Sequence, residues 1–222
     1  MTFDELELFK SALPPVPAIS NFNEYGRCVV LVALTSIKDE LYFVIEKRSA
    51  GIKQAGELCF PGGLFDPLLD ADFEATALRE TREELGLPDK SINVIGRLDT
   101  IIAHRGMIVE VFVGAVDIAA EDIRINRAEV DKIIFMPVSF FQNNPPKEHH
   151  VLVQLHPTCI DPESGQEITL LPCKDLGLAP QYHQPWGEFK QKIFVYNTEE
   201  GLIWGLTARI VHDFVRKFRS FQ

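Results

Sequence analysis

The sequence predicts an α/β (α+β) fold in which a mixed β-sheet carries helices on its sides. Two pairs of β-branched and aromatic runs predict strands, and runs with apolar residues at helical spacing lie between and after them. The chain has 222 residues, which is enough to bury a sizeable core. We therefore expect a single domain over residues 1–222.

The N-terminal half contains the first strand pair and a strongly charged helix. Residues 2–12 have a helical pattern that the prolines near residues 14–17 end, so we expect an N-terminal helical extension over residues 1–24. The runs RCVVLVALTS and ELYFVIEKRS then predict a hairpin of two strands. A helix is expected from Phe73 to Leu85, because Asp72 can cap its start and Gly86 can end it.

The C-terminal half begins with a second strand pair, formed by the runs SINVIGRLDTIIA and GMIVEVFVGAV. The run NRAEVDKIIFMPVSFF predicts a short strand and a short helix. Residues 142–191 are rich in Pro and predict a long loop-rich insertion, although VLVQLHP and EITLLP are candidate strands. The run KIFVYN predicts a strand, and a final helix with one apolar face follows, in which we expect Trp204 to be buried.

Composition and charge limit the partners. The net charge of −10 argues against nucleic acid, because affinity for its backbone comes largely from Lys and Arg. The chain has no apolar run of about 20 residues and its start is acidic, so we expect neither a membrane span nor a secretory signal, and we expect a cytoplasmic location. The four cysteines form no C-x-x-C pair, which argues against a zinc ribbon. The oligomeric state stays open, a homodimer included.

The helix over residues 73–85 concentrates negative charge on one face. At about 100° per residue, Glu80, Glu83 and Glu84 fall together, opposite the apolar face. Like charges at this spacing repel each other, so either the face is simply solvated or a cation offsets the repulsion. Carboxylates are ligands that Mg²⁺ and Mn²⁺ prefer, and the upstream FPGG turn lets the backbone approach a ligand closely. Together they indicate a site for a metal-bound phosphate.

These residues resemble the Nudix box, G-x5-E-x7-R-E-U-x-E-E-x-G-U, through GG at 62–63 and RETREELGL at 79–87. Thr81 replaces an aliphatic residue of that pattern, the first half is two residues longer, and Leu69 stands where the first Glu would fall. The run VIEKRSAGIKQAGELCFPGG, the aspartates Asp66 and Asp70, and the later run IWGLTARIV are similar to the coenzyme A pyrophosphatase branch. The resemblance implies a Nudix-type mixed β-sheet sandwiched between helices.

The resemblance also implies roles for individual residues. Glu80, Glu83 and Glu84 would hold Mg²⁺ or Mn²⁺ and carry catalysis, with Glu80 as base or ligand, and the carbonyl of Gly62 would join the metal. Arg79 would orient a glutamate. The residues implied at the substrate are Arg48, Lys53 and Gly63, and Arg105 is a further cation to test. Glu129 is the candidate for an additional base or ligand, with His149 and His150 as alternatives.

The expected activity is the metal-dependent hydrolysis of a nucleoside diphosphate linked to another moiety. The preferred substrate is coenzyme A or acyl-CoA, giving 3′,5′-ADP and 4′-phosphopantetheine. One alternative is a Nudix hydrolase of ADP-ribose, NADH or another dinucleotide. The other is a non-catalytic nucleotide-binding regulatory module, which we would expect to have lost some of the three glutamates. The sequence does not decide the substrate, the number of metal ions or the role of residues 142–191.

Overall fold

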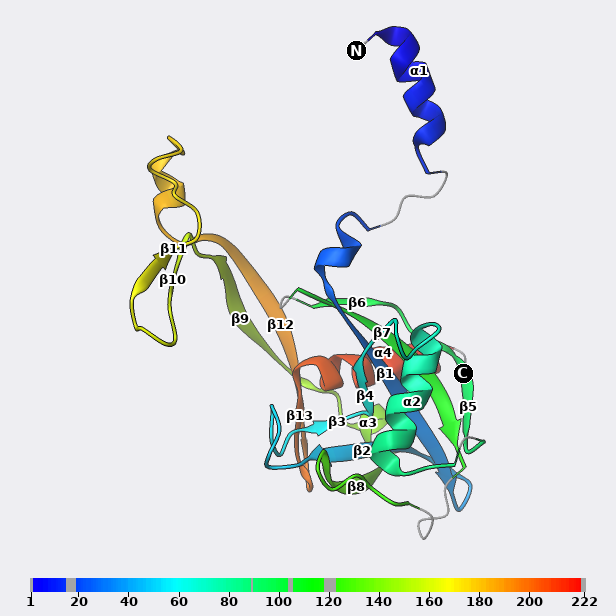
Figure 1. The fold of residues 1–222 in the computed structure, drawn as a ribbon. Coiled ribbons are helices and arrows are strands. Elements are labelled where there is room, and N and C mark those ends of the chain that lie inside the picture. Colours follow the sequence, from blue (N-terminus) through cyan, green and yellow to red (C-terminus); the bar gives the residue numbers. More distant parts are fainter. Residues whose placement is uncertain (1, 15–18, 89, 104–105, 118–122, 221–222) are drawn as a thin grey trace. The chain divides into compact units, whose positions relative to one another are not determined.

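The structure is a computed structural model that describes the chain except for residues 1, 15–18, 89, 104–105, 118–122 and 221–222 (Figure 1). Arg105 and the centre of the predicted turn beside it lie outside the described residues. The chain forms two compact units, Met1–Val138 and Ser139–Gln222. Among the described residues, no helix combines the length and the apolar character that crossing a membrane requires.

The first unit contains the strands of the main sheet and the acidic helix. Its elements, in chain order, are α1 (Phe3–Ala12), η1 (Phe22–Glu24), β1 (Gly26–Ile37), β2 (Glu40–Arg48), β3 (Leu58–Cys59), β4 (Gly62–Leu64), α2 (Phe73–Leu85), β5 (Ile92–Arg97), β6 (Ile101–Ala103), β7 (Met107–Val116) and β8 (Val130–Pro137). Both predicted strand pairs and both predicted helices are therefore present.

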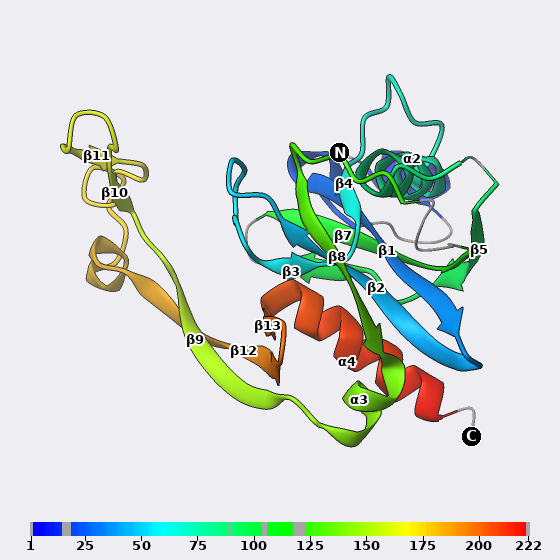
Figure 2. The same cartoon turned by 90° about the horizontal axis from the view of Figure 1, so that it is seen from below.

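The main sheet is mixed, which confirms the predicted fold class. Its strand order is β3-β2-β1-β7-β5, with β8 on β2 and both β5 and β6 on β7. The pairing between β1 and β7 is parallel, and the other pairs are antiparallel. Helix α2 lies along one side of this sheet in both views (Figures 1 and 2). That a helix covers its other side stays a prediction.

The hairpin of β1 and β2 is split along its length. The two strands pair with each other only near the hairpin turn, where Leu34 lies opposite Phe43. Further along, β4 pairs with β1 and β3 pairs with β2, so these two short strands occupy the gap. The N–H of Leu31 donates to the carbonyl of Pro61, at 3.0 Å, and the Phe60 ring packs edge-on against Phe43, with 5.4 Å between ring centroids. The Pro-Gly-Gly turn is thereby built into the sheet.

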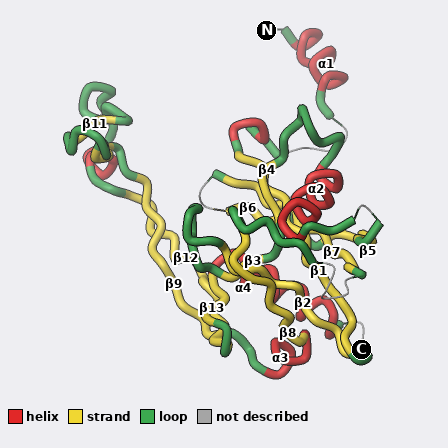
Figure 3. Tube along the Cα trace, turned by 60° about the horizontal axis from the view of Figure 1, so that its bottom comes forward, coloured by secondary structure: helices red, strands yellow, loops and turns green. Residues whose placement is uncertain are grey.

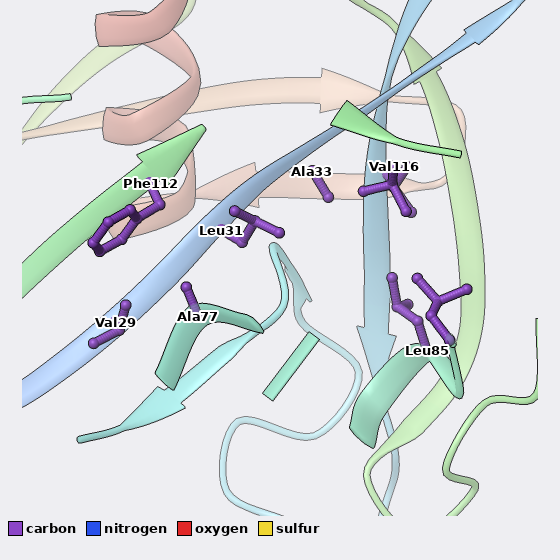
Figure 4. Close-up of a cluster of buried hydrophobic side chains, with 9 residues drawn as sticks. Val29, Leu31, Ala33, Ala77, Leu85, Phe112 and Val116 are labelled. Carbon is purple, nitrogen blue, oxygen red and sulfur yellow. The ribbon is translucent and has the colours of Figure 1, made fainter. Parts of the chain in front are cut away.

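Helix α2 forms where local signals predict it and packs on the sheet through its apolar face. Asp72 accepts a hydrogen bond from the Ala75 N–H at 2.9 Å, and Gly86 ends the helix with a left-handed φ of 64°. A buried cluster joins the helix to the sheet (Figure 4). The members of this cluster are Val29, Leu31, Ala33, Val44, Ala77, Leu85, Leu87, Phe112 and Val116.

The second unit contains a long antiparallel ribbon. Helix α3 (Val138–Asn143) leads into it, and its further elements are β9 (Lys147–Leu155), β10 (Thr158–Ile160), β11 (Glu167–Thr169), η2 (Pro180–His183), β12 (Trp186–Thr198), β13 (Gly201–Trp204) and α4 (Gly205–Arg219). Strand β9 pairs with β12 over most of its length (Figure 3). Both candidate strands within residues 142–191 are thus present: β9 is held by the distant strand β12, and β11 by the nearby strand β10.

The prediction that Trp204 is buried in the last helix is wrong. Helix α4 starts at Gly205, and Trp204 is the last residue of β13, where its exposed fraction is 47%. Side chains alternate along a strand, and Ile203 takes the buried position with 0% exposure, so its neighbour Trp204 faces outward. The predicted apolar face of α4 is confirmed at Ile210, Val211 and Phe214, which are buried, whereas Leu206 and Phe218 are each 38% exposed.

Leu85 tests how far the cluster beneath α2 stabilises the first unit. Its exposed fraction is 0%, so Leu85→Ala should lower the free energy of unfolding by about 2–5 kcal/mol through lost burial and a cavity. Urea denaturation measures the change. The control is Leu68→Ala, because Leu68 is 90% exposed and its truncation should cost no more than about 0.5 kcal/mol. Equal losses in the two variants would contradict the described core.

Candidate active site

The glycine turn and the acidic helix contact each other directly. The N–H of Gly62 donates to Oε2 of Glu84 at 2.9 Å, a contact between residues that are 22 positions apart. A Cβ atom added at Gly63 would overlap the carboxyl group of Glu80. Gly63 therefore leaves the space that the Glu80 carboxyl group occupies, whereas at Gly62, with a φ of +155°, an added Cβ would overlap the backbone of Val29. The turn and the glutamates that the sequence predicts to act together do lie together.

The glutamates of α2 have different surroundings. Glu84 is buried, with 4% exposure, whereas the side chain of Glu83 is 57% exposed and that of Glu80 is 17% exposed. Glu84 is therefore not part of a solvated helix face. Thr81, one of the departures from the box pattern, is buried, and its hydroxyl is paired because Oγ1 donates to the carbonyl of Ala77 at 2.7 Å.

Four carboxylates in this region repel one another. Burial is the largest cause that raises the pKa of Glu84, repulsion from Glu46 raises it further, and the N–H of Gly62 opposes both. Burial also raises the pKa of Glu80, although its hydrogen bond to Arg79 works against the shift. The exposed residue Glu129 adds to the repulsion at both sites. A cation would relieve this accumulation of negative charge.

Arg79 connects the box loop to the helix. Its Nε and Nη2 atoms donate to the two carboxylate oxygens of Asp70, at 2.8 and 2.9 Å. The third nitrogen, Nη1, donates to Glu80 at 2.9 Å and to Glu83 at 3.4 Å. The Arg79 hydrogen bond is the largest cause that lowers the pKa of Asp70, to about 2. The geometry fits the orienting role expected of Arg79.

Sequence reasoning missed two acidic residues of this region. Asp70 was expected only as part of a lengthened loop, yet it binds Arg79 and also accepts from the Thr76 hydroxyl at 2.9 Å. Glu46 is absent from the predicted site, although it is buried on β2 with an exposed fraction of 1%. The available signal was its position two residues after Val44, because alternation then points both side chains to the same face.

Arg48 lies at the edge of the carboxylate group, and Lys53 lies in the loop after β2. The Nε of Arg48 donates to the backbone carbonyl of Lys53 at 3.1 Å, and the Arg48 charge is attracted to Glu46 and Glu84. The Lys53 residue itself is exposed. The structure therefore brings Arg48 to the site and fixes its guanidinium through the backbone, rather than the side chain, of Lys53.

The donor atoms suit a hard divalent cation by their chemistry. Carboxylate oxygens are the ligands that Mg²⁺ and Mn²⁺ prefer, and their mutual repulsion favours a positive charge among them. One buried carboxylate oxygen, Oε2 of Glu46, has no hydrogen-bond partner. Within the described ranges, however, no three His, Cys, Asp or Glu side chains already surround a common point in a way that could hold a metal ion.

Several aromatic and histidine candidates belong to the second unit. His149 and His150 are exposed on β9. The rings of Tyr182 and Trp186 contact each other in a T-shaped arrangement, with 5.5 Å between centroids. The contact shows that Trp186 packs locally against Tyr182.

Comparison with known proteins places the chain in a family. The sequence model of the NUDIX domain matches residues 24–159, so the chain belongs to the Nudix hydrolase family. It is 29% identical over 215 residues to the uncharacterized Nudix hydrolase NudL of Photorhabdus laumondii, and the alignment covers 96% of each chain.

Two further proteins share part of the chain. The peroxisomal coenzyme A diphosphatase NUDT7 of Mus musculus is 37% identical over 113 residues, which span 50% of this chain and 47% of that protein. A solved Nudix hydrolase structure from M. smegmatis, RenU, aligns with a TM-score of 0.45 and 16% identity over 55% of this chain and 76% of that chain.

Asp70 tests whether the contact with Arg79 stabilises the folded chain. We expect Asp70→Asn to lower the free energy of unfolding at neutral pH by about 1.5–3 kcal/mol, the scale of hydrogen bonds to charged groups. The pKa of Asp70 is lowered from 3.8 to about 2, so its contribution is complete above 3.8 and is lost as the pH falls toward 2. Thermal melts across this range should show the gap between wild type and variant narrowing.

The matched control is Asp72→Asn. Asp72 caps α2, and asparagine is an equally good cap, so this variant should be close to wild type at neutral pH. A gap for Asp70→Asn that stays constant from neutral to acid pH would show that the ion pair is not the source of its effect.

Proposed function

We propose that this Nudix hydrolase cleaves the diphosphate bond of coenzyme A or an acyl-CoA, giving 3′,5′-ADP and 4′-phosphopantetheine, with Mg²⁺ or Mn²⁺ as cofactor. The contact between the Gly62–Gly63 turn and the glutamates of α2 carries the chemistry of this proposal. The similarity to a coenzyme A diphosphatase over half of the chain supports the substrate. Residues 58–64 and α2 both fall in the matched part of the chain.

The carboxylates of α2 have the central role in the proposed reaction. Glu80, Glu83 and Glu84 would hold the divalent cation, together with the Gly62 carbonyl. A cation bound there supplies positive charge that offsets the charge of the diphosphate and activates water. Arg79 keeps Glu80 and Glu83 in place through its two hydrogen bonds, and Asp70 keeps Arg79 in place. Either Glu80 or Glu129 would accept the proton of the attacking water.

The basic residues before the turn would bind the phosphates of the substrate. The Arg48 guanidinium lies beside the carboxylates, so it is suited to the diphosphate or to the 3′-phosphate of coenzyme A. Lys53 is exposed on the loop that Arg48 holds, where its ammonium group is free to reach a second phosphate oxygen. Gly63 would contact the substrate through its backbone, and its lack of a side chain leaves the Glu80 carboxyl group its place beside the turn. A small-molecule nucleotide is the proposed partner, and the cytoplasmic location and the homodimer remain predictions from the sequence.

Removal of the metal and of its ligands should abolish turnover without unfolding the chain. Chelation with EDTA should leave no hydrolysis of coenzyme A, and Mg²⁺ or Mn²⁺ should restore it. Glu83→Gln and Glu84→Gln should each lower the rate by about 100-fold or more, because several kcal/mol of charge stabilisation is lost. A thermal melt beside each rate measurement checks the fold.

The matched control for both glutamates is Glu74→Gln. Glu74 is exposed in the first turn of the same helix, and its variant should keep the wild-type rate. A rate unaffected by EDTA would exclude the metal-dependent reaction. Metal binding without hydrolysis of any dinucleotide would instead point to a regulatory module.

The 3′-phosphate of coenzyme A tests the substrate assignment. Dephospho-coenzyme A lacks only this group, and if Lys53 binds it, kcat/KM should fall by about 10- to 100-fold, equivalent to about 1.5–3 kcal/mol. Lys53→Ala should cause a similar loss on coenzyme A while keeping the carbonyl that holds Arg48. The two losses should not add, because both remove the same contact. The same comparison applies to Arg48→Ala.

The control for this series is Lys38→Ala, because Lys38 is an exposed lysine at the turn between β1 and β2. This variant should have the wild-type kcat/KM for both coenzyme A and dephospho-coenzyme A. Equal kcat/KM values for the two substrates, or faster turnover of ADP-ribose than of coenzyme A, would reject coenzyme A as the substrate and leave the Nudix chemistry in place.

A further inference from the structure

Glu46 is an unusual residue within the main sheet. It lies in β2 between strands β3 and β8, with an exposed fraction of 1%. Its side chain points to the face that carries Val44, and Val44 belongs to the buried cluster under α2. Glutamate at this position puts a carboxyl group where an apolar side chain would ordinarily pack. A buried carboxyl group costs free energy unless a hydrogen-bond donor or a positive charge is paired with it.

The contacts of Glu46 satisfy only one of its two oxygens. The Cys59 thiol donates to Oε1, with 3.4 Å between sulfur and oxygen. The second oxygen, Oε2, is the one buried side-chain nitrogen or oxygen without a hydrogen-bond partner among the residues that the structure describes. A thiol is a weak donor, so even the satisfied oxygen is held weakly. Oε2 is therefore able to accept a hydrogen bond or to bind a cation.

The surroundings of Glu46 are those of the proposed cation site. Glu46 and Glu84 repel each other, and Glu80 and Glu129 repel Glu46 as well. Arg48 attracts Glu46, yet its described hydrogen bonds go to the Lys53 carbonyl and the Cys59 sulfur. The positive charge that would balance Glu46 is thus not supplied by a direct hydrogen bond from this arginine.

We propose that Glu46 is a fourth carboxylate of the cation site, with Oε2 accepting from the divalent cation or from a water in its hydration shell. The inference rests on the proposed metal dependence and adds a residue from the sheet to the ligands expected on α2. It explains why a buried carboxyl group faces three other carboxylates, and why one of its oxygens is unpaired. Through Glu46, strand β2 would determine the position of the cation as directly as α2 does.

The test is a binding measurement with Mn²⁺ alone, by isothermal titration calorimetry in the absence of substrate. Wild type should bind Mn²⁺, and Glu84→Gln should lose most of this binding. Glu46→Gln keeps the shape and removes the charge, and it should raise the dissociation constant by about 10- to 100-fold, as changes around metal ligands do. The matched control is Glu40→Gln on the same strand, because Glu40 is exposed and its variant should bind like wild type.

The outcomes separate this inference from the proposed function. If wild type does not bind Mn²⁺, both are wrong. If Glu84→Gln weakens binding but Glu46→Gln does not, only the role of Glu46 is wrong, and its carboxyl group is a structural element of the core. If Glu46→Gln fails to fold, a crystal structure of wild type with Mn²⁺ located by anomalous scattering decides the question. Oε2 in contact with Mn²⁺ or with its water supports the proposal, and Oε2 remote from both overturns it.

Discussion

The candidate site depends on the split between strands β1 and β2. A two-stranded hairpin would have joined these strands along their length, but here they separate and the chain returns through the gap as β3, the Pro-Gly-Gly turn and β4. The backbone of the turn is fixed by the sheet on one side, through the bond from Leu31 to Pro61, and by the helix on the other, through the bond from Gly62 to Glu84. A glycine backbone is thereby held against a carboxylate with little freedom to move.

Charge is the second constraint, and it opposes the first. Closing the helix onto the turn brings Glu84 into the interior beside Glu46, which costs free energy unless a positive group compensates. Arg79 compensates the charge of Glu80 and Glu83 at the helix surface, through the one nitrogen that Asp70 does not occupy. The fold therefore gives up stability to assemble acceptors, as proteins often do where a ligand is to be bound.

Sequence reasoning succeeded where the determining signals are local. The bounds of α2 follow from the cap at Asp72 and the glycine at 86, and the first hairpin follows from two β-branched runs. It failed where the role of a residue depends on a partner that is distant in the sequence. Asp70 has a role because Arg79 folds back onto it, and Glu46 is significant because β3 and α2 close around it. Trp204 was predicted to lie in the helix because the amino-acid composition does not change where β13 ends and α4 begins, at Gly205.

The hydrogen bond between Gly62 and Glu84 has a consequence for observing this site. Its amide proton connects the turn to the helix, so its exchange with deuterated solvent requires the two to separate. Exchange at this one proton would therefore follow the opening of the site itself, while exchange at the Leu31 amide, which bonds to Pro61, would follow the opening of the sheet beneath it. The amide protons of Gly62 and Leu31 could thus distinguish opening of the binding site from local unfolding of the sheet beneath it.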